Sequence, residues 1–177
     1  MPAGDGDDAR EGVLAHLLWQ MDDDRKTTGL KSLQGKVWQD GYLRGELKGH
    51  LFEDVPRALA RWSERGREVY IYSSGSIAAQ RLLFGHSIGG DLCPLLTGFF
   101  DTTTGPKREA SSYARIAESL RRQPQDVVFA TDHLGEAQAA HAAGLTAIIA
   151  VRPGNAPLPV HPFREVSSLD ELDEVLA

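Results

Sequence analysis

The sequence predicts an α/β fold in which helices cover both faces of a parallel sheet. Beyond residue 52, short apolar runs alternate with longer amphipathic segments, and this alternation is typical of parallel sheets. The runs VYIY, VVFA and TAIIAV contain almost no polar residues, as expected of strands that are buried on both sides. In such sheets ligands bind beyond the carboxyl ends of the strands. Polar residues at those ends are therefore the candidates for function.

The first 50 residues are expected to be helical, without strands. Residues 1–10 are acidic and polar, and we expect them to form a disordered start. Residues 11–24 carry apolar side chains at helical spacing. A second helix is expected to begin at Thr27 or Thr28, since either hydroxyl could cap it. It should weaken in the glycine-rich segment that follows Trp38.

The remaining residues supply the alternating helices and strands. In the first of these helices, Asp54 is the expected N-cap and Gly66 the expected end. The expected helices are 54–66, 76–87, 107–123 and 135–144, the expected strands are 68–73, 97–103, 126–132 and 145–154, and residues 163–176 should form a short strand with a final helix.

Composition excludes several classes of partner. The chain has 177 residues and a formal net charge of −6, whereas nucleic acids and anionic membranes attract a basic face. The single cysteine, Cys93, allows no intrachain disulfide, which favours a reducing, cytoplasmic location. The start of the sequence lacks the basic and apolar regions of a signal peptide. We therefore expect a small-molecule partner and neither nucleic acid nor membrane.

Two hydroxyls, Ser73 and Ser74, follow the apolar run VYIY directly. A strand that ends in hydroxyls before a helix can cradle an anion, because the free N–H groups of the helix start point toward the same place. The alternative is that Ser74 or Ser76 only caps the following helix. Capping by one residue does not account for the pair.

Charged residues stand at two further positions near the same predicted edge. Asp132 ends a strand and Glu136 follows four residues later, a pair that suits Mg²⁺. The alternative is a helix cap with a first-turn acid. Lys107 opens a predicted helix, where a cation is unfavourable for the helix dipole unless it faces an anionic ligand. The alternative there is a solvated surface lysine.

Along the sequence the hydroxyls come first, then the lysine, then the acids at the end of a strand. This order resembles that of the haloacid dehalogenase (HAD)-like phosphohydrolases. The segments DRKTTGLKSLQGKVWQDGY, VYIYSSGSIAAQRLLFGHS, FFDTTTGPKREASSYARIA and VRPGN are similar to the enolase-phosphatases, also called acireductone synthases. This resemblance implies a monomeric Mg²⁺ enzyme of methionine salvage that enolises and dephosphorylates 2,3-diketo-5-methylthiopentyl-1-phosphate. It implies that Ser73 and Ser74 bind the phosphate, that Lys107 is catalytic and contacts it, and that Asp132 binds Mg²⁺, with Glu136 as the second acid. Residues 11–50 would be part of a cap, and residues 51–177 the core.

One element of the superfamily does not occur in this sequence. The resemblance implies a central first strand that ends in DxDxT and carries the nucleophilic aspartate, but DGDDA and DDDRKT do not fit that pattern. We therefore expect an N-terminally shortened chain without phosphatase turnover, and doubtful stability as a monomer. Direct pairing of strands 68–73 and 126–132, or an oligomer that fills the gap, are the structural alternatives. The functional alternatives are a non-catalytic phosphate- or Mg²⁺-binding remnant, a regulatory partner, or a phosphatase for another small phosphate ester.

Overall fold

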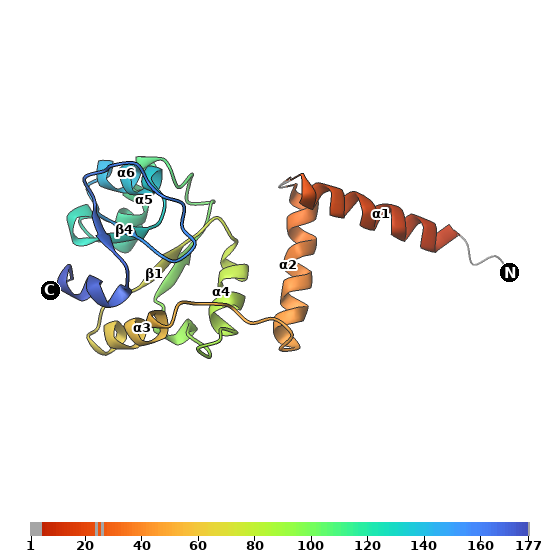
Figure 1. Cartoon of the computed structure of the whole chain (residues 1–177), viewed down its shortest axis with the longest axis horizontal. Coiled ribbons are helices and arrows are strands. Elements are labelled where there is room, and N and C mark those ends of the chain that lie inside the picture. Colours follow the sequence, from red (N-terminus) through yellow and green to blue (C-terminus); the bar gives the residue numbers. More distant parts are fainter. Residues whose placement is uncertain (1–4, 24, 26, 177) are drawn as a thin grey trace. The chain divides into compact units, whose positions relative to one another are not determined.

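The computed structural model describes residues 5–23, 25 and 27–176. The chain divides into two compact units, Met1–Leu47 and Lys48–Ala177 (Figure 1). Each unit is described by itself. The division falls within the glycine-rich segment that follows the second helix.

The first unit consists of two helices, α1 (Asp5–Asp22) and α2 (Thr28–Leu43). Because α1 begins at Asp5, the expected disorder of the first ten residues is wrong for residues 5–10, and residues 1–4 lie outside the described part. The hydroxyl of Thr27 accepts a hydrogen bond from the Leu30 N–H, which confirms Thr27 as the cap of α2. The assignment of this unit to a cap stays a prediction.

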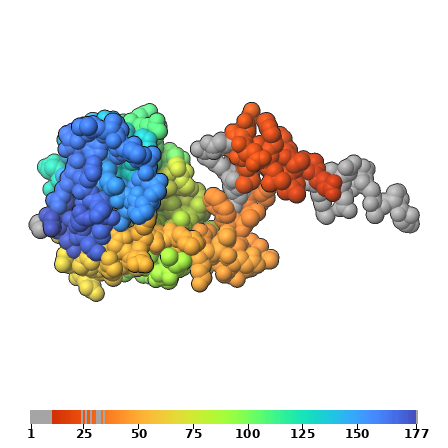
Figure 2. All heavy atoms as spheres, viewed as in Figure 1, coloured from red at the N-terminus to blue at the C-terminus, as the bar shows by residue number. Residues whose placement is uncertain are grey.

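The second unit contains the alternating elements. Figure 2 shows its C-terminal segment, in blue, spread over one face beside α3. In chain order the elements are α3 (Asp54–Glu64), β1 (Tyr70–Tyr72), α4 (Ile77–Gly85), η1 (Cys93–Leu95), β2 (Gly98–Phe100), α5 (Ala110–Leu120), η2 (Pro124–Asp126), β3 (Val128–Thr131), α6 (Leu134–Ala142), β4 (Thr146–Ala150), β5 (Arg164–Val166) and η3 (Leu169–Glu174).

One expected helix detail is wrong. Asp54 is the first residue of α3 and not its cap, and its carboxylate bonds instead to Arg152 and to the backbone of Leu169. These contacts join segments that are far apart in the sequence. The expected final helix is present as the 3₁₀ helix η3, whose capping box pairs Ser168 with Glu171.

All strand pairs are parallel, as predicted, but they form two separate sheets. β1 pairs with β2, and β3, β4 and β5 form a sheet in that order. β1 and β3 do not pair with each other, so direct pairing of these two strands is excluded. Within the described residues no strand lies between them. The expectation that a central strand is missing from this sequence stays a prediction.

Two apolar clusters cover opposite faces of the strands, because successive side chains of a strand point to opposite sides. One cluster joins α3, η3 and η1 to Ile71 of β1, Val128 of β3 and Ile148 of β4. The other joins α5 and α6 to Tyr72, Phe129 and Ile149, the next residue on each of the same strands. The predicted α/β architecture, with helices on both faces, is confirmed.

Candidate functional site

The candidate site lies at the carboxyl ends of β1, β3 and β4. Ser73 follows β1, Asp132 follows β3, and the turn that ends in Asn155 follows β4. All strands in this unit run parallel within their sheets, so these residues are at the edge where ligands bind in α/β proteins.

The loop after β1 leaves the Ser74 hydroxyl without a described partner. The Ser73 N–H donates to the Phe100 carbonyl at 3.1 Å, and the Ser73 hydroxyl accepts from the Gly75 N–H at 3.2 Å. The cap of α4 is Ser76, whose hydroxyl accepts from the Ala79 N–H. Ser74 is therefore not the cap. It is exposed, and no hydrogen-bond partner is described for its hydroxyl among residues 27–176. Ser74 is available to a ligand.

Gln80 fixes this loop and was missed by sequence reasoning. Its side-chain amide nitrogen donates to the Gly75 carbonyl at 2.8 Å and to the Phe100 carbonyl at 2.9 Å. The side chain is buried, and so the loop after β1 is tied to the end of β2. A glutamine among the apolar residues of IAAQRLLF was the signal that could have revealed it.

Lys107 links the ends of β1 and β3. It stands in the turn before α5, not in the helix itself. Its Nζ lies 2.8 Å from Glu136 Oε2 and 5.7 Å from the centre of the Tyr72 ring. Glu136 Oε2 also accepts a hydrogen bond from the hydroxyl of Thr131, the last residue of β3, at 2.8 Å. The side chains of Lys107 and Glu136 are only 24% and 12% exposed. They therefore form a partly buried ion pair at this edge.

Asp132 is oriented by a turn that follows β4. The Asn155 side-chain amide donates to Asp132 Oδ2 at 2.9 Å, while Asn155 Oδ1 accepts from the Arg152 N–H at 2.5 Å. The Asn155 N–H donates back to the Arg152 carbonyl. Gly154 has φ +92°, and Pro153 precedes it, as in a type II turn. Because the Asn155 oxygen is already engaged, its NH₂ group is directed to Asp132.

The alternative reading of Asp132 as a helix cap is wrong. The N-cap of α6 is His133, whose Nδ1 accepts from the Gly135 N–H at 3.1 Å. Asp132 is exposed, and no protein hydrogen bond is described to its Oδ1. One carboxylate oxygen is thus held by Asn155, and the other faces no described donor.

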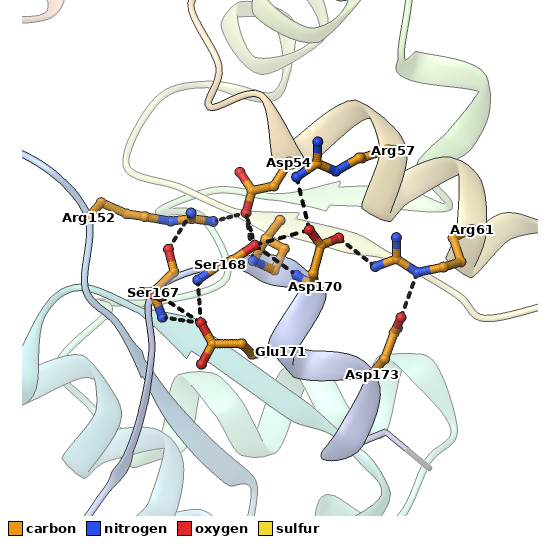
Figure 3. A network of polar contacts seen from close by, with 10 residues as sticks. Asp54, Arg57, Arg61, Arg152, Ser167, Ser168, Asp170, Glu171 and Asp173 are labelled. Carbon is orange, nitrogen blue, oxygen red and sulfur yellow. Dashed lines mark hydrogen bonds and ion pairs between the residues drawn. The ribbon is translucent and has the colours of Figure 1, made fainter.

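A network of polar contacts holds Arg152, the first residue of this turn (Figure 3). The Arg152 guanidinium donates to Asp54 Oδ2 at 2.6 Å and to the Ser167 carbonyl at 2.7 Å. Asp54 Oδ2 also accepts from the Leu169 N–H at 2.6 Å and from the Ser168 hydroxyl at 3.1 Å. Burial raises the pKa of Asp54, but the hydrogen bonds from Arg152, Leu169 and Ser168 outweigh it and hold the pKa below its ordinary value. Asp54 is therefore a buried, ionised anchor.

The side-chain oxygens at this edge provide only some of the ligands that a hard divalent cation needs. In the described part of the chain no three His, Cys, Asp or Glu side chains gather into a metal cluster. Glu136 is paired with Lys107, which leaves the Asp132 carboxylate as the available anionic ligand. Mg²⁺ commonly takes one or two protein carboxylates and completes its shell with water and substrate phosphate. Asp132 fits that role, and Glu136 as a ligand stays a prediction.

Comparison with known proteins places this chain in a family. The sequence profile of the haloacid dehalogenase-like hydrolases matches residues 8–144. Enolase-phosphatase E1 of Synechococcus elongatus is 49% identical over 172 residues, which are 97% of this chain and 72% of that protein. This chain belongs to the enolase-phosphatase family. Enolase-phosphatase E1 of Xenopus tropicalis is also 49% identical, over 89% of this chain and 62% of that protein.

A solved structure agrees with the family assignment. The UTR4 protein of Saccharomyces cerevisiae has a TM-score of 0.79 and 36% identity to this chain, covering 89% of this chain and 73% of that one. A HAD phosphatase from Thermococcus onnurineus, 20% identical with a TM-score of 0.66, shares the fold. Among the helices that the structure describes, none is long and apolar enough to cross a membrane.

Proposed function

We propose that this chain forms the phosphate-binding side of an acireductone synthase site. Its substrate would be 2,3-diketo-5-methylthiopentyl-1-phosphate, which is enolised and then dephosphorylated in methionine salvage. The observation that carries the proposal is the Lys107–Glu136 ion pair, which joins the ends of β1 and β3. It occurs in a chain that is 49% identical to an enolase-phosphatase over nearly its whole length. The single cysteine supports a cytoplasmic location.

Each side chain has a separate role in this proposal. The hydroxyls of Ser73 and Ser74 bind the phosphoryl oxygens. Lys107 offsets the negative charge that the phosphoryl group carries in the transition state. Glu136 and Thr131 hold the lysine in place through the short contacts at 2.8 Å. The nucleophilic aspartate implied by the family would come from a DxDxT strand that residues 1–177 do not contain.

Asp132 would hold Mg²⁺ through the oxygen that Asn155 leaves free. The cation supplies electrostatic stabilisation of the phosphoryl oxygens when it is bound. The protein's part is to orient the carboxylate, which the Asn155 amide does by donating to Oδ2. Residues that orient a metal ligand in this way commonly change metal affinity by about 10- to 100-fold when they are replaced.

The experiment is a substrate comparison on a completed protein. The completed protein joins residues 1–177 to the portion of the Synechococcus elongatus enolase-phosphatase E1 that this chain does not match, and phosphate release is measured with Mg²⁺. The proposal expects turnover of the diketone phosphate far above that of generic esters such as p-nitrophenyl phosphate. Comparable rates on both would instead favour a phosphatase for another small ester. Binding of phosphate and Mg²⁺ without turnover of either substrate would favour a non-catalytic remnant.

A further inference from the structure

The turn that carries Lys107 is held in place by side chains. It connects β2 to α5, and residues 101–109 form no helix or strand. The four consecutive backbone carbonyls of residues 104–107 each accept a hydrogen bond from a different side chain. The donors, in that order, are Arg115 at 2.7 Å, Tyr72 at 2.8 Å, Ser112 at 2.8 Å and Tyr113 at 2.6 Å. Because these donors lie on β1 and α5, two elements fix the turn.

The backbone of this turn approaches α5 closely. Gly105 has φ +149°, and a Cβ at this position would overlap the Ser112 hydroxyl oxygen. Ser112 is fully buried, and its hydroxyl donates to the Pro106 carbonyl. A buried carbonyl without a partner is unfavourable, so the hydroxyl supplies a bond that a regular element would otherwise provide. The glycine and the serine thus allow the turn to lie directly against the helix.

Tyr113 holds the residue that matters most in this turn. Its side chain is fully buried, and its ring packs edge-on against the rings of Tyr72, at 5.7 Å, and Phe129, at 4.9 Å. Burial raises the pKa of the Tyr113 hydroxyl, which therefore keeps its proton and remains a donor. It donates to the Lys107 carbonyl at 2.6 Å. Since Tyr113 is inaccessible to a ligand, it can act on one only through another residue.

Lys107 is consequently held at both ends. Tyr113 fixes its backbone carbonyl, and Glu136 Oε2 lies 2.8 Å from its Nζ. A lysine side chain is a flexible four-carbon stem, so the place that its ammonium group reaches depends on where the backbone starts. A catalytic group that is misplaced by about 1 Å can lose about 100-fold in rate. The position of the turn therefore bears directly on what Lys107 can do.

We propose that Tyr113 and Ser112 are positioning residues for Lys107. Their hydroxyls hold the carbonyls of Lys107 and Pro106, and the ammonium group is thereby directed to the phosphoryl oxygens. Neither hydroxyl touches the substrate. This inference deepens the proposed function and rests on it for the role of the lysine.

The first test measures how firmly Lys107 is held in the intact chain, residues 1–177, without substrate. The chain is treated with acetic anhydride, and mass spectrometry compares the acetylation rate of Lys107 with that of the exposed Lys48 in the same sample. An amine reacts only when it is neutral and free to attack. Tyr113→Phe, which keeps the buried ring, should raise the rate ratio about 3- to 10-fold, the effect expected of one lost hydrogen bond.

Tyr70→Phe is the matched control. Tyr70 also lies on β1 beside an aromatic ring, that of Phe100, but no hydrogen bond is described for its hydroxyl within residues 27–176. This variant should leave the rate ratio unchanged. Ser112→Ala provides a second test if Tyr113→Phe does not fold, and it should raise the ratio in the same direction. A ratio that is unchanged in the folded anchor variants, or raised equally in Tyr70→Phe, would overturn the proposal.

The second test separates positioning from a general structural role. In the completed protein, Tyr113→Phe should lower kcat about 10-fold or more and change KM by less than about 2-fold. In a Lys107→Ala background, single-turnover rates should show no further loss from Tyr113→Phe, because a residue that acts through the lysine has nothing left to position. An equal loss in both backgrounds would assign Tyr113 a structural role only.

The two tests also separate this inference from the proposed function. Acetylation needs no substrate, so a raised Lys107 ratio in Tyr113→Phe supports the anchoring even in a protein without turnover. A completed protein that shows this ratio but does not dephosphorylate the diketone phosphate would count against the proposed function alone.

Discussion

Replacing Asp54 by asparagine should destabilise the second unit by about 3 kcal/mol. The side chain of Asp54 is 7% exposed, and its carboxylate accepts from Arg152 at 2.6 Å, from the Leu169 N–H at 2.6 Å and from the Ser168 hydroxyl at 3.1 Å. Removing one partner of a buried ion pair typically costs about 3–5 kcal/mol. The lower end applies because the Arg152 side chain is 12% exposed and keeps its bond to the Ser167 carbonyl.

The assay is urea unfolding followed by far-ultraviolet circular dichroism. With a denaturant dependence of about 2 kcal/mol per molar urea, the midpoint should fall by about 1.5 M. Glu68→Gln is the matched control, because Glu68 forms an exposed ion pair with Arg122 at 3.2 Å and should contribute less than about 1 kcal/mol. A midpoint for Asp54→Asn that equals that of the control would refute the anchoring role of the network.

The pH dependence of the free energy of unfolding in acid gives a second test of the role of Asp54. The pKa of Asp54 in the folded chain lies below its ordinary value of 3.8. The contribution of Asp54 to the free energy of unfolding is therefore fully present above about pH 3.8. It is lost as the pH falls through the lower pKa that Asp54 has in the folded chain. Asp54→Asn should remove this part of the pH dependence, leaving a flatter curve below pH 4.

Three further predictions concern the candidate site. In the completed protein, Lys107→Ala and Asp132→Ala should each lower turnover by orders of magnitude, because both side chains act on transition-state charge; near-normal steady-state rates for either variant would remove that residue from the site. Asn155→Ala should raise the Mg²⁺ concentration needed for half-maximal activity about 10-fold or more, and an unchanged Mg²⁺ titration would argue against its role in orienting Asp132. Purified residues 1–177 alone should release no phosphate from the diketone phosphate in a colorimetric assay, whereas Mg²⁺-dependent release would show that the DxDxT strand is not required.

Local sequence patterns were sufficient for the strands and for the polar residues at their ends. VYIY, VVFA and TAIIAV are strands because their apolar runs are buried between two helical layers. The positions of Ser73 and Asp132 follow from those strands, since a residue that ends a parallel strand lies at the ligand-binding edge. These predictions need only the order of residues along a short stretch of chain.

The contacts that orient the site could not be predicted in that way. Asp54 was expected to cap the helix it begins, but its partner Arg152 is 98 residues away in the sequence. Asn155 and Asp132 are separated by 23 residues. A local pattern contains no information on which distant side chain will arrive beside a carboxylate. The short contact between Lys107 and Glu136 has the same origin.

The most direct measurement is a crystal structure of the completed protein with Mg²⁺ and phosphate. We expect the phosphate within hydrogen-bonding distance of the Ser73 and Ser74 hydroxyls and of Lys107 Nζ, and Mg²⁺ coordinated by Asp132, with Asn155 still bonded to the other carboxylate oxygen. A phosphate bound away from Ser73 and Lys107, or Mg²⁺ without Asp132 in its shell, would contradict the assignment of this edge as the phosphoryl site.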